Sequence, residues 1–326
     1  MSSVYWSFEP DPARTAALRA EVDRRLWSSL HYIFGEVDGL DPGNSFDAWI
    51  ARVESAERAD PLIHLLFHAL VAALEEGDQN SANRIAARML AQEPAAPGLA
   101  IRSAEADDDS ARPVALFDRF ADLEKAEQLD LTIPDPEAIA AALPHIEAGL
   151  RLVKANDPSL DGELHALLSE LLLVGQKPGH GFTAAAVSCF QAWGSLMVNP
   201  SQMRDALDVV EMIAHEVTHL TLFGLAIDEP LLTNDPEELH YSPIRKAPRT
   251  MDGVYHATIV AARIWRALQA QANAPGASDE LKELSLERAT KAAELFHDGV
   301  AVIEGAAQLM PIGRQVLDDC KAHVAG

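Results

Sequence analysis

The sequence predicts a mainly α-helical protein with a small β element, and three observations support this fold class. Apolar residues recur at spacings of three and four along most of the chain, as in helices with one buried face. A turn-rich break at residues 175–181 is followed by residues 182–198, which lack helical periodicity. Apolar residues make up 48% of the 326 residues, so the chain can bury a substantial core.

Most of the chain is predicted to be helical, with loops and short strands between the N-terminal and the C-terminal helices. The stretch 93–113, rich in Pro, Gly and Ala, is predicted to be an exposed loop or junction, with the run Asp107–Asp109 as a solvated surface. Residues 182–198 are predicted to form one or two short strands, and residues 199–201 to cap the following helix. The polar, proline-containing stretch 227–249 is expected to be a long, lid-like loop. Helices are expected at residues 16–34, 46–55, 61–75, 81–90, 136–154, 160–173, 206–223, 251–272, 278–309 and 313–324.

The chain is divided into an N-terminal helical region, residues 1–110, and a second region, residues 111–326, which together are compatible with one continuous domain. Asp and Glu outnumber Lys and Arg by 50 to 26, for a net charge of -24. A nucleic-acid partner is disfavoured because a phosphate-binding surface needs the opposite excess, whereas a basic peptide would be attracted. Two distant cysteines, no signal peptide and no membrane-spanning stretch predict a soluble, cytoplasmic protein, with its oligomeric state left open.

Residues 215–219 read His-Glu-Val-Thr-His and predict a metal site on a helix. Positions four apart lie one turn above each other on the same helix face, so His215 and His219 can hold one metal ion. Glu216 lies at the edge of that face, within reach of a metal-bound water or ligand. Because the flanking residues are apolar at helical spacing, we expect a zincin-like metal helix with a short sheet or hairpin beside it.

A third protein ligand is required and the motif does not supply it. Leu222 and Leu225 occupy the positions that a glycine and a third histidine take in the longer zinc-peptidase pattern. His256 is the favoured candidate, because it lies on an apolar helix where a buried imidazole needs a partner. His240 is expected to be a loop residue. Three further carboxylates remain possible ligands: Glu229, Glu237 and Glu238.

Two other sets of histidines are interpreted without a metal. His64 and His68 are also four apart, but their neighbours are apolar and Leu65 stands where the motif has glutamate, so both are expected in the core. His180, between glycines, is expected in an exposed turn.

A series of short segments in the C-terminal half carries a resemblance to a known family. The Tyr-Ser-Pro-Ile-Arg and Pro-Arg pairings within residues 241–249 are its most specific part, because the five-residue metal motif is shared with unrelated peptidases. In this order the segments resemble the HExxH-motif peptide-modification proteins of ribosomal natural-product pathways, the αKG-HExxH-type peptide β-hydroxylases. The segments are residues 181–183, 190–199, 213–219, 241–249, 253–256 and 311–314.

The resemblance implies an oxidoreductase that holds Fe(II), binds 2-oxoglutarate, activates O2 and hydroxylates a β-carbon of a precursor peptide. His215, His219 and His256 would hold the iron. Since a carboxylate more commonly takes the third position, the identity of the third ligand is left open. Arg245 or Arg249 would bind the distal carboxylate of 2-oxoglutarate. Glu216 would orient a ligand or the peptide. The alternatives are a zinc peptidase with Glu216 as general base, and a peptide-binding scaffold without activity.

Overall fold

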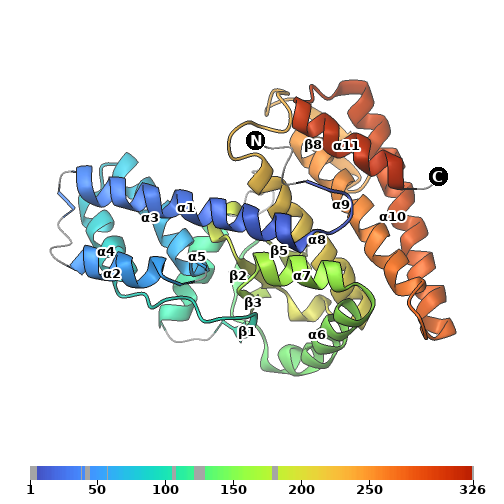
Figure 1. The fold of residues 1–326 in the computed structure, drawn as a ribbon, viewed down its shortest axis with the longest axis horizontal. Helices are drawn as coiled ribbons and strands as arrows, with labels where there is room; N and C mark the ends of the chain where they lie inside the picture. Colours follow the sequence, from blue (N-terminus) through green and yellow to red (C-terminus); the bar gives the residue numbers. More distant parts are fainter. Residues whose placement is uncertain are drawn as a thin grey trace. The chain divides into compact units, whose positions relative to one another are not determined.

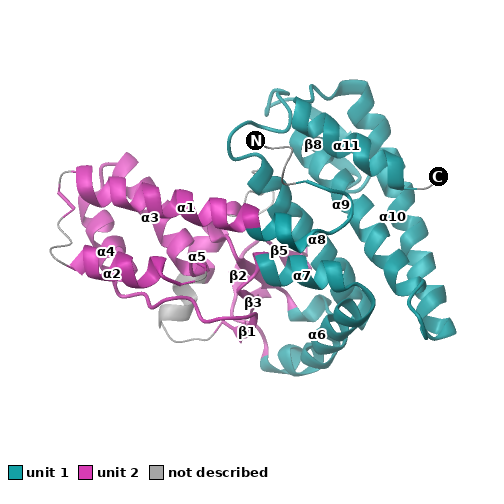
Figure 2. Ribbon diagram, in the orientation of Figure 1, with its two compact units in different colours: residues 1–16, 136–166, 200–326 teal, residues 17–135, 167–199 magenta. Residues whose placement is uncertain are grey.

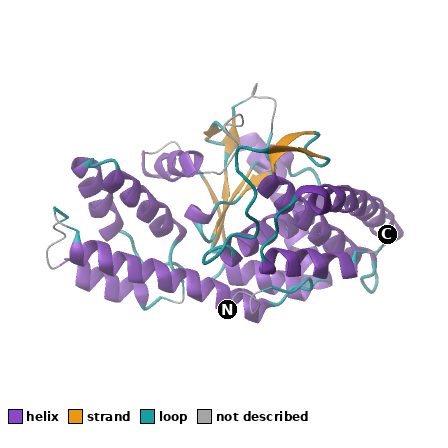
Figure 3. Ribbon diagram, turned by 90° about the horizontal axis from the view of Figure 1, so that it is seen from above, coloured by secondary structure: helices purple, strands orange, loops and turns teal. Residues whose placement is uncertain are grey.

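The computed structural model describes residues 6–37, 39–40, 45–56, 58–104, 108–120, 129–177 and 183–324, with side chains left out at residues 108–113. In the described chain 65% of residues are helical, and the strands form small sheets. Figures 1 and 3 show this dominance of helices over strands. The prediction of a mainly helical protein with a small β element is confirmed.

The chain forms two compact units whose segments alternate along the sequence (Figure 2). Unit 1 contains residues 1–16, 136–166 and 200–326. Unit 2 contains residues 17–135 and 167–199. The division of the sequence into residues 1–110 and 111–326 stays a prediction.

Unit 2 packs helices around a four-stranded sheet and a two-stranded sheet. In the larger sheet the order is β1-β3-β6-β5, with β1, β3 and β6 parallel and β5 antiparallel to β6. All four residues of β6 are buried, as expected for a strand with neighbours on both edges. The elements of unit 2 are most of α1 (Pro12–Glu36), α2 (Ser45–Glu54), α3 (Pro61–Glu75), α4 (Gln79–Leu90), α5 (Asp108–Phe120), β1 (Ala100–Ser103), β2 (Leu131–Thr132), β3 (Glu170–Leu173), β4 (Gly175–Gln176), β5 (Ala186–Val187) and β6 (Ser195–Val198).

Unit 1 is built on three long helices that pack closely, α8 beside α9 and α9 beside α10. Gly299 of α10 lies against Thr258 of α9, and a Cβ at residue 299 would lie 2.1 Å from the Thr258 hydroxyl oxygen. The absence of a side chain at this glycine therefore allows the two backbones to approach. The elements of unit 1 are α6 (Pro136–Asn156), α7 (Pro158–Leu167), α8 (Ala206–Leu225), β7 (Leu239–Ser242), β8 (Ala247–Thr250), α9 (Met251–Ala272), α10 (Asp279–Ala306) and α11 (Pro311–His323).

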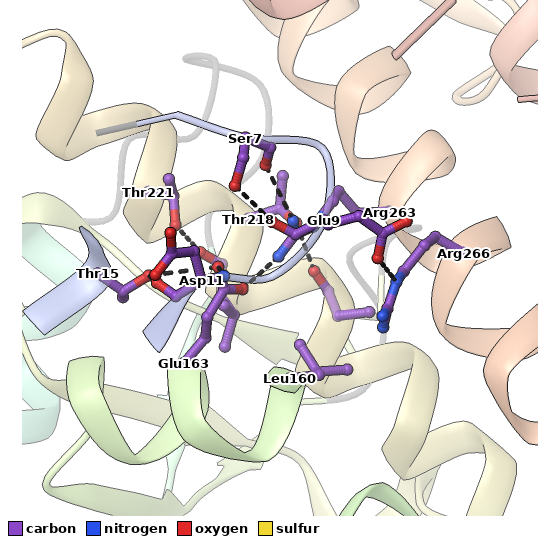
Figure 4. A network of polar contacts seen from close by, with 12 residues as sticks. Ser7, Glu9, Asp11, Thr15, Leu160, Glu163, Thr218, Thr221, Arg263 and Arg266 are labelled. Carbon is purple, nitrogen blue, oxygen red and sulfur yellow. Dashed lines mark hydrogen bonds and ion pairs between the residues drawn. The ribbon is translucent and has the colours of Figure 1, made fainter. Parts of the chain in front are cut away.

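A buried ion pair in unit 1 ties α9 to α7 and to the N-terminal segment (Figure 4). Arg263 of α9 pairs with Glu163 of α7, and both side chains are about 95% buried. The same guanidinium donates to the carbonyl of Phe8, and Glu163 accepts from the backbone N–H of Asp11 at 2.8 Å. Since a buried charge without its partner is costly, this network holds α9 in position along its length.

Several sequence-based boundaries are confirmed, and others are wrong in instructive places. The expected loop at 93–113 contains β1 and the start of α5, and Asp107 lies outside the described residues. The expected helix at 160–173 ends at Leu167, and strand β3 begins at Glu170. The last three residues of β3 are buried, and periodicity alone does not distinguish such an apolar run from a helix. Short strands at 182–198 are confirmed as β5 and β6.

The long loop expected at 227–249 is also wrong in its second half, where β7 and β8 form a hairpin. Prolines suggested a loop, but Pro248 lies in one strand of a two-stranded ladder, where a missing N–H is tolerated. His240 is therefore a strand residue. Across the described residues, no helix has the length and apolarity needed to cross a membrane.

Candidate metal centre

Helix α8 carries the five-residue motif, and its start is set by a side-chain cap. Asp205 has extended backbone angles, and its carboxylate accepts a hydrogen bond from the Asp208 N–H. This replaces the expected cap at residues 199–201, where Pro200 begins a short 3-10 turn instead. Arg288 of α10 binds Asp205, Asp208 and Glu211, so the first turns of α8 are tied to α10.

The two motif histidines face each other as their spacing predicts. Nε2 of His215 lies 3.1 Å from Nε2 of His219. Two imidazole nitrogens bound to one metal by bonds of about 2.0–2.1 Å stand roughly 2.9–3.4 Å apart, for angles between right and tetrahedral. The observed separation of the pair therefore fits a shared metal ion.

Helix α9 brings His256 to the same place. Thr250 caps α9 by accepting from the Gly253 N–H, and Tyr255 anchors it by donating to the Gly313 carbonyl at 2.7 Å. His256 is 7% exposed, and its ring stacks on His219 at a centroid distance of 5.4 Å. The structure thus brings together all three histidines that the sequence singled out.

The three imidazoles form a chain and not a cage. His219 presents Nε2 to His215, and it presents Nδ1 to Nδ1 of His256 at 3.2 Å. No set of three or more His, Cys, Asp and Glu side chains in the described parts of the chain is arranged as a ready metal site. In this conformation His256 therefore faces the wrong edge of His219 to share its metal, and it is placed as a hydrogen-bond partner.

When Nε2 of His215 and Nε2 of His219 face a metal, the ring nitrogen that carries the proton is fixed for both His219 and His256. The proton of His219 is then on Nδ1 and is donated to Nδ1 of His256. His256 in turn carries its proton on Nε2, which lies 3.9 Å from Oδ2 of Asp252. Asp252 was not singled out from the sequence, although its spacing of four residues before His256 on a helix was the available signal.

Burial keeps the motif histidines neutral, which is the form that binds metals. Burial lowers the pKa of His219 well below its usual value, and the charges of His215, His256 and Arg245 add to this effect. Burial also lowers the pKa of His215 to about 4, with a further contribution from Arg245. Because 39% of the His215 side chain is exposed, solvent weakens the effect there, and we assign the stronger shift to His219.

Glu216 lies beside the histidine pair and away from solvent. The residue is 3% exposed, and its Oε1 is 3.9 Å from Nε2 of His215. A carboxylate in this position is near any ligand that approaches the metal-facing side of His215. The position fits both interpretations of Glu216, general base and orienting group.

The β7–β8 hairpin places the two arginines differently. Arg245 is exposed in the turn, and its charge acts on both motif histidines. Arg249 pairs across the hairpin with His240, so both side chains lie on the same face, where they are half-buried. Of the two, Arg245 is the one whose charge lowers the pKa values of both motif histidines.

The remaining candidate ligands do not join this group in the described contacts. Glu229, Glu237 and Glu238 are exposed. Nε2 of His240 is buried without a hydrogen bond, and it lies 3.6 Å from Oε1 of Glu238. His180 lies outside the described residues.

The separation of His215 and His219 fits a metal that accepts nitrogen ligands. Neutral imidazoles suit Zn(II) and Fe(II) alike, so the set of donors does not choose between them. The chain was also compared with known proteins. No family model matches it, and no curated protein matches it.

Proposed function

We propose that the protein is a metal-dependent peptide hydroxylase that uses Fe(II) and 2-oxoglutarate and acts on a β-carbon of a ribosomally made precursor peptide. The observation that carries the metal site is the Nε2 pair of His215 and His219 at 3.1 Å, continued to His256 at 3.2 Å. The resemblance of residues 241–249 and 253–256 to the αKG-HExxH-type hydroxylases supports iron chemistry. Bound iron would supply O2 activation, with one oxygen atom entering the peptide and the other entering succinate as CO2 leaves.

The protein residues bind and orient. His215 and His219 would hold the metal through Nε2, and His256 would support His219 from its Nδ1 side or, after the imidazole side chains rearrange, would become the third ligand. The distal carboxylate of 2-oxoglutarate requires a cation near the metal, and the guanidinium of Arg245 would supply it. The charge of Arg245 lowers the pKa values of both motif histidines, which supports this role. Glu216, buried beside His215, orients the bound ligand or peptide.

The alternative function is a zinc peptidase, and one observation favours it. Glu216 lies 3.9 Å from Nε2 of His215, within reach of a metal-bound water, and would serve as general base. Peptide binding without catalysis is a third possibility, for which the imidazole chain would be structural.

Incubation of the protein with a candidate precursor peptide, Fe(II), ascorbate and 2-oxoglutarate distinguishes the three. Mass spectrometry of the peptide is expected to show a gain of one oxygen atom that requires 2-oxoglutarate. Cleavage of the peptide with Zn(II) and without 2-oxoglutarate would assign the peptidase instead. An unchanged peptide and no retained metal would leave only the binding role.

Three substitutions sharpen this experiment. Arg245→Ala is expected to weaken 2-oxoglutarate binding at least tenfold while metal content is unchanged, because a charge-assisted pair is lost. Arg249→Ala is the matched variant for comparison, because Arg249 lies on the half-buried face of the same hairpin. Glu216→Gln should abolish a peptidase, since an amide is no base, whereas the hydroxylase should keep measurable activity. If Arg245→Ala loses bound metal to the same extent as 2-oxoglutarate binding, the role of the arginine is structural.

A further inference from the structure

The outer face of the β7–β8 hairpin exposes large apolar side chains. Leu239 and Tyr241 are 57% and 60% exposed, and the ladder puts Tyr241 opposite Pro248, which is also exposed. Cross-strand partners share a face, so these side chains form one surface. We call Leu239, Tyr241 and Pro248 the outer hairpin face.

The opposite face anchors the hairpin in unit 1. Ser242 is 1% exposed, and its cross-strand partner Ala247 is half-buried. His240 and Arg249, also partners, are half-buried as well. Since one face already packs, the apolar residues of the outer hairpin face contribute little to the core and remain available to a partner.

Charge is distributed unevenly along the hairpin. At the tip, Arg245 and Lys246 are adjacent and exposed, in a chain whose net charge is -24. At the base, Glu237 and Glu238 are exposed just before β7. A partner that lies along the outer hairpin face therefore meets positive charge at one end and negative charge at the other.

The hairpin is also connected to the metal centre. The charge of Arg245 lowers the pKa values of His215 and His219, so the tip lies within electrostatic reach of the pair. At its other end, β8 runs directly into α9, which carries His256. Leu239 and Tyr241 therefore lie on a hairpin whose turn carries a charge that acts on the histidines.

We propose that the outer hairpin face binds an extended peptide segment in which apolar side chains lie next to acidic ones along the chain. The apolar side chains lie on Tyr241 and Leu239, and the acidic side chains reach Lys246 at the tip. The distance from Leu239 to the turn spans about four strand residues, roughly 13 Å, so the two kinds of side chain are separated by a similar length of extended chain. This proposal deepens the proposed function and rests on it, because the segment would belong to the peptide substrate.

Fluorescence anisotropy with metal-free protein tests the surface without any catalysis. The probe is a short fluorescein-labelled synthetic peptide with aliphatic residues followed by glutamates. Tyr241→Ala is expected to raise its Kd about tenfold, which corresponds to about 1.4 kcal/mol, because exposed tyrosines are frequent binding hot spots. Lys246→Glu is expected to raise the Kd severalfold and to flatten its dependence on salt.

Matched controls come from exposed positions elsewhere. Tyr32→Ala removes a tyrosine that is 66% exposed on α1, and Lys282→Glu reverses an exposed charge on α10; both should leave the Kd unchanged. Metal content of Tyr241→Ala, measured separately, should equal that of the wild type and so shows that the hairpin and α9 remain folded.

Three results would overturn the docking surface: an unchanged Kd in Tyr241→Ala, an equal rise in Tyr32→Ala, or equally tight binding of a probe with lysines in place of glutamates. Peptide binding with the expected effects of the variants, but no oxygen gained with iron and 2-oxoglutarate, supports the surface and contradicts the hydroxylase. Oxygen transfer that is insensitive to Tyr241→Ala supports the hydroxylase and contradicts the surface.

Discussion

Two pairs of histidines in this protein have the same helical spacing and opposite surroundings. His64 and His68 lie four apart on α3 of unit 2, and His215 and His219 lie four apart on α8 of unit 1. All four imidazoles are at least partly buried. The difference between the pairs lies in what each ring contacts, and it decides which pair is available to a metal.

In the α3 pair, His64 is hydrogen-bonded to a carboxylate and His68 packs against aromatic rings. Nε2 of His64 lies 3.0 Å from Oδ1 of Asp23, whose other oxygen accepts from Nε of Arg19 at 2.9 Å. His68 contacts aromatic rings, with Phe67 at 5.0 Å and Phe190 at 5.9 Å between centroids. The expectation that both histidines belong to the core is confirmed for His64, which is 3% exposed, whereas His68 is half-buried.

The α8 pair contacts other imidazoles. His215 and His219 face each other, and His219 also faces His256, so ring nitrogens in this group lie within hydrogen-bond distance of other ring nitrogens. A carboxylate with its own arginine locks a histidine in place, whereas neutral imidazoles that face each other can be recruited by a metal without breaking an ion pair.

The largest expected effect breaks the α3 arrangement. Asp23→Ala leaves Arg19 buried without its carboxylate and His64 without its acceptor, so we expect a loss of about 3–5 kcal/mol in the free energy of unfolding. Urea unfolding followed by circular dichroism measures it. Metal content at the α8 pair should be unchanged in the protein that remains folded.

Asp78→Ala is the matched control, because Asp78 is an exposed aspartate that caps α4. The loss of such a cap should cost only about 1 kcal/mol. If Asp23→Ala costs no more than this control, the buried triad does not stabilise unit 2 and the contrast between the pairs fails.

The next effect concerns the rank of the three histidines at the metal centre. His219→Ala removes a ligand and should abolish stoichiometric metal binding. His256→Ala removes the partner of Nδ1 of His219 and is expected to weaken metal affinity about 10- to 100-fold, the usual effect of a lost outer-shell hydrogen bond. Metal titration with a competing chelator measures both.

His165→Ala, which changes an exposed histidine on α7, is the control and should bind metal as the wild type does. A loss in His256→Ala as complete as that in His219→Ala would show that the His256 ring turns and ligates the metal directly.

The sequence located the α8 pair and His256 but did not reveal how they connect. Helix periodicity and the spacing of four residues were sufficient to place His215 and His219 on one face, since both properties are local. The approach of His256 depends on the packing of α9 against α8. The choice of which edge of His219 it meets depends on side-chain rotamers, to which sequence patterns are blind.

The errors in the fold have a similar origin. The run at residues 170–173 has no period that separates a buried strand from a helix, and its identity as β3 depends on pairing with β1 and β6, distant in the sequence. The hairpin at 239–250 was predicted as part of a loop because this stretch contains prolines. Its pairing gives Arg245, in the turn, a position quite different from that of Arg249, although the sequence treated the two as equivalent.

The smallest expected effect comes from His68, the least constrained member of the α3 pair. Burial lowers the pKa of His68 to about 4, with a contribution from the charge of His64. A histidine whose pKa is lower in the folded state stabilises the fold fully above its unfolded pKa of about 6.5, and this stability is lost as the pH falls toward 4.

His68→Phe should keep the aromatic contacts with Phe67 and Phe190 and change the free energy of unfolding by less than about 1.5 kcal/mol at pH 7.5. At pH 5 the variant should lose less stability than the wild type, because no imidazole needs to be protonated at this site. Urea unfolding at both pH values measures the difference. His219→Phe is the corresponding change in the α8 pair, and it should remove metal binding instead. An identical acid sensitivity in wild type and His68→Phe would place the titrating groups elsewhere in the protein.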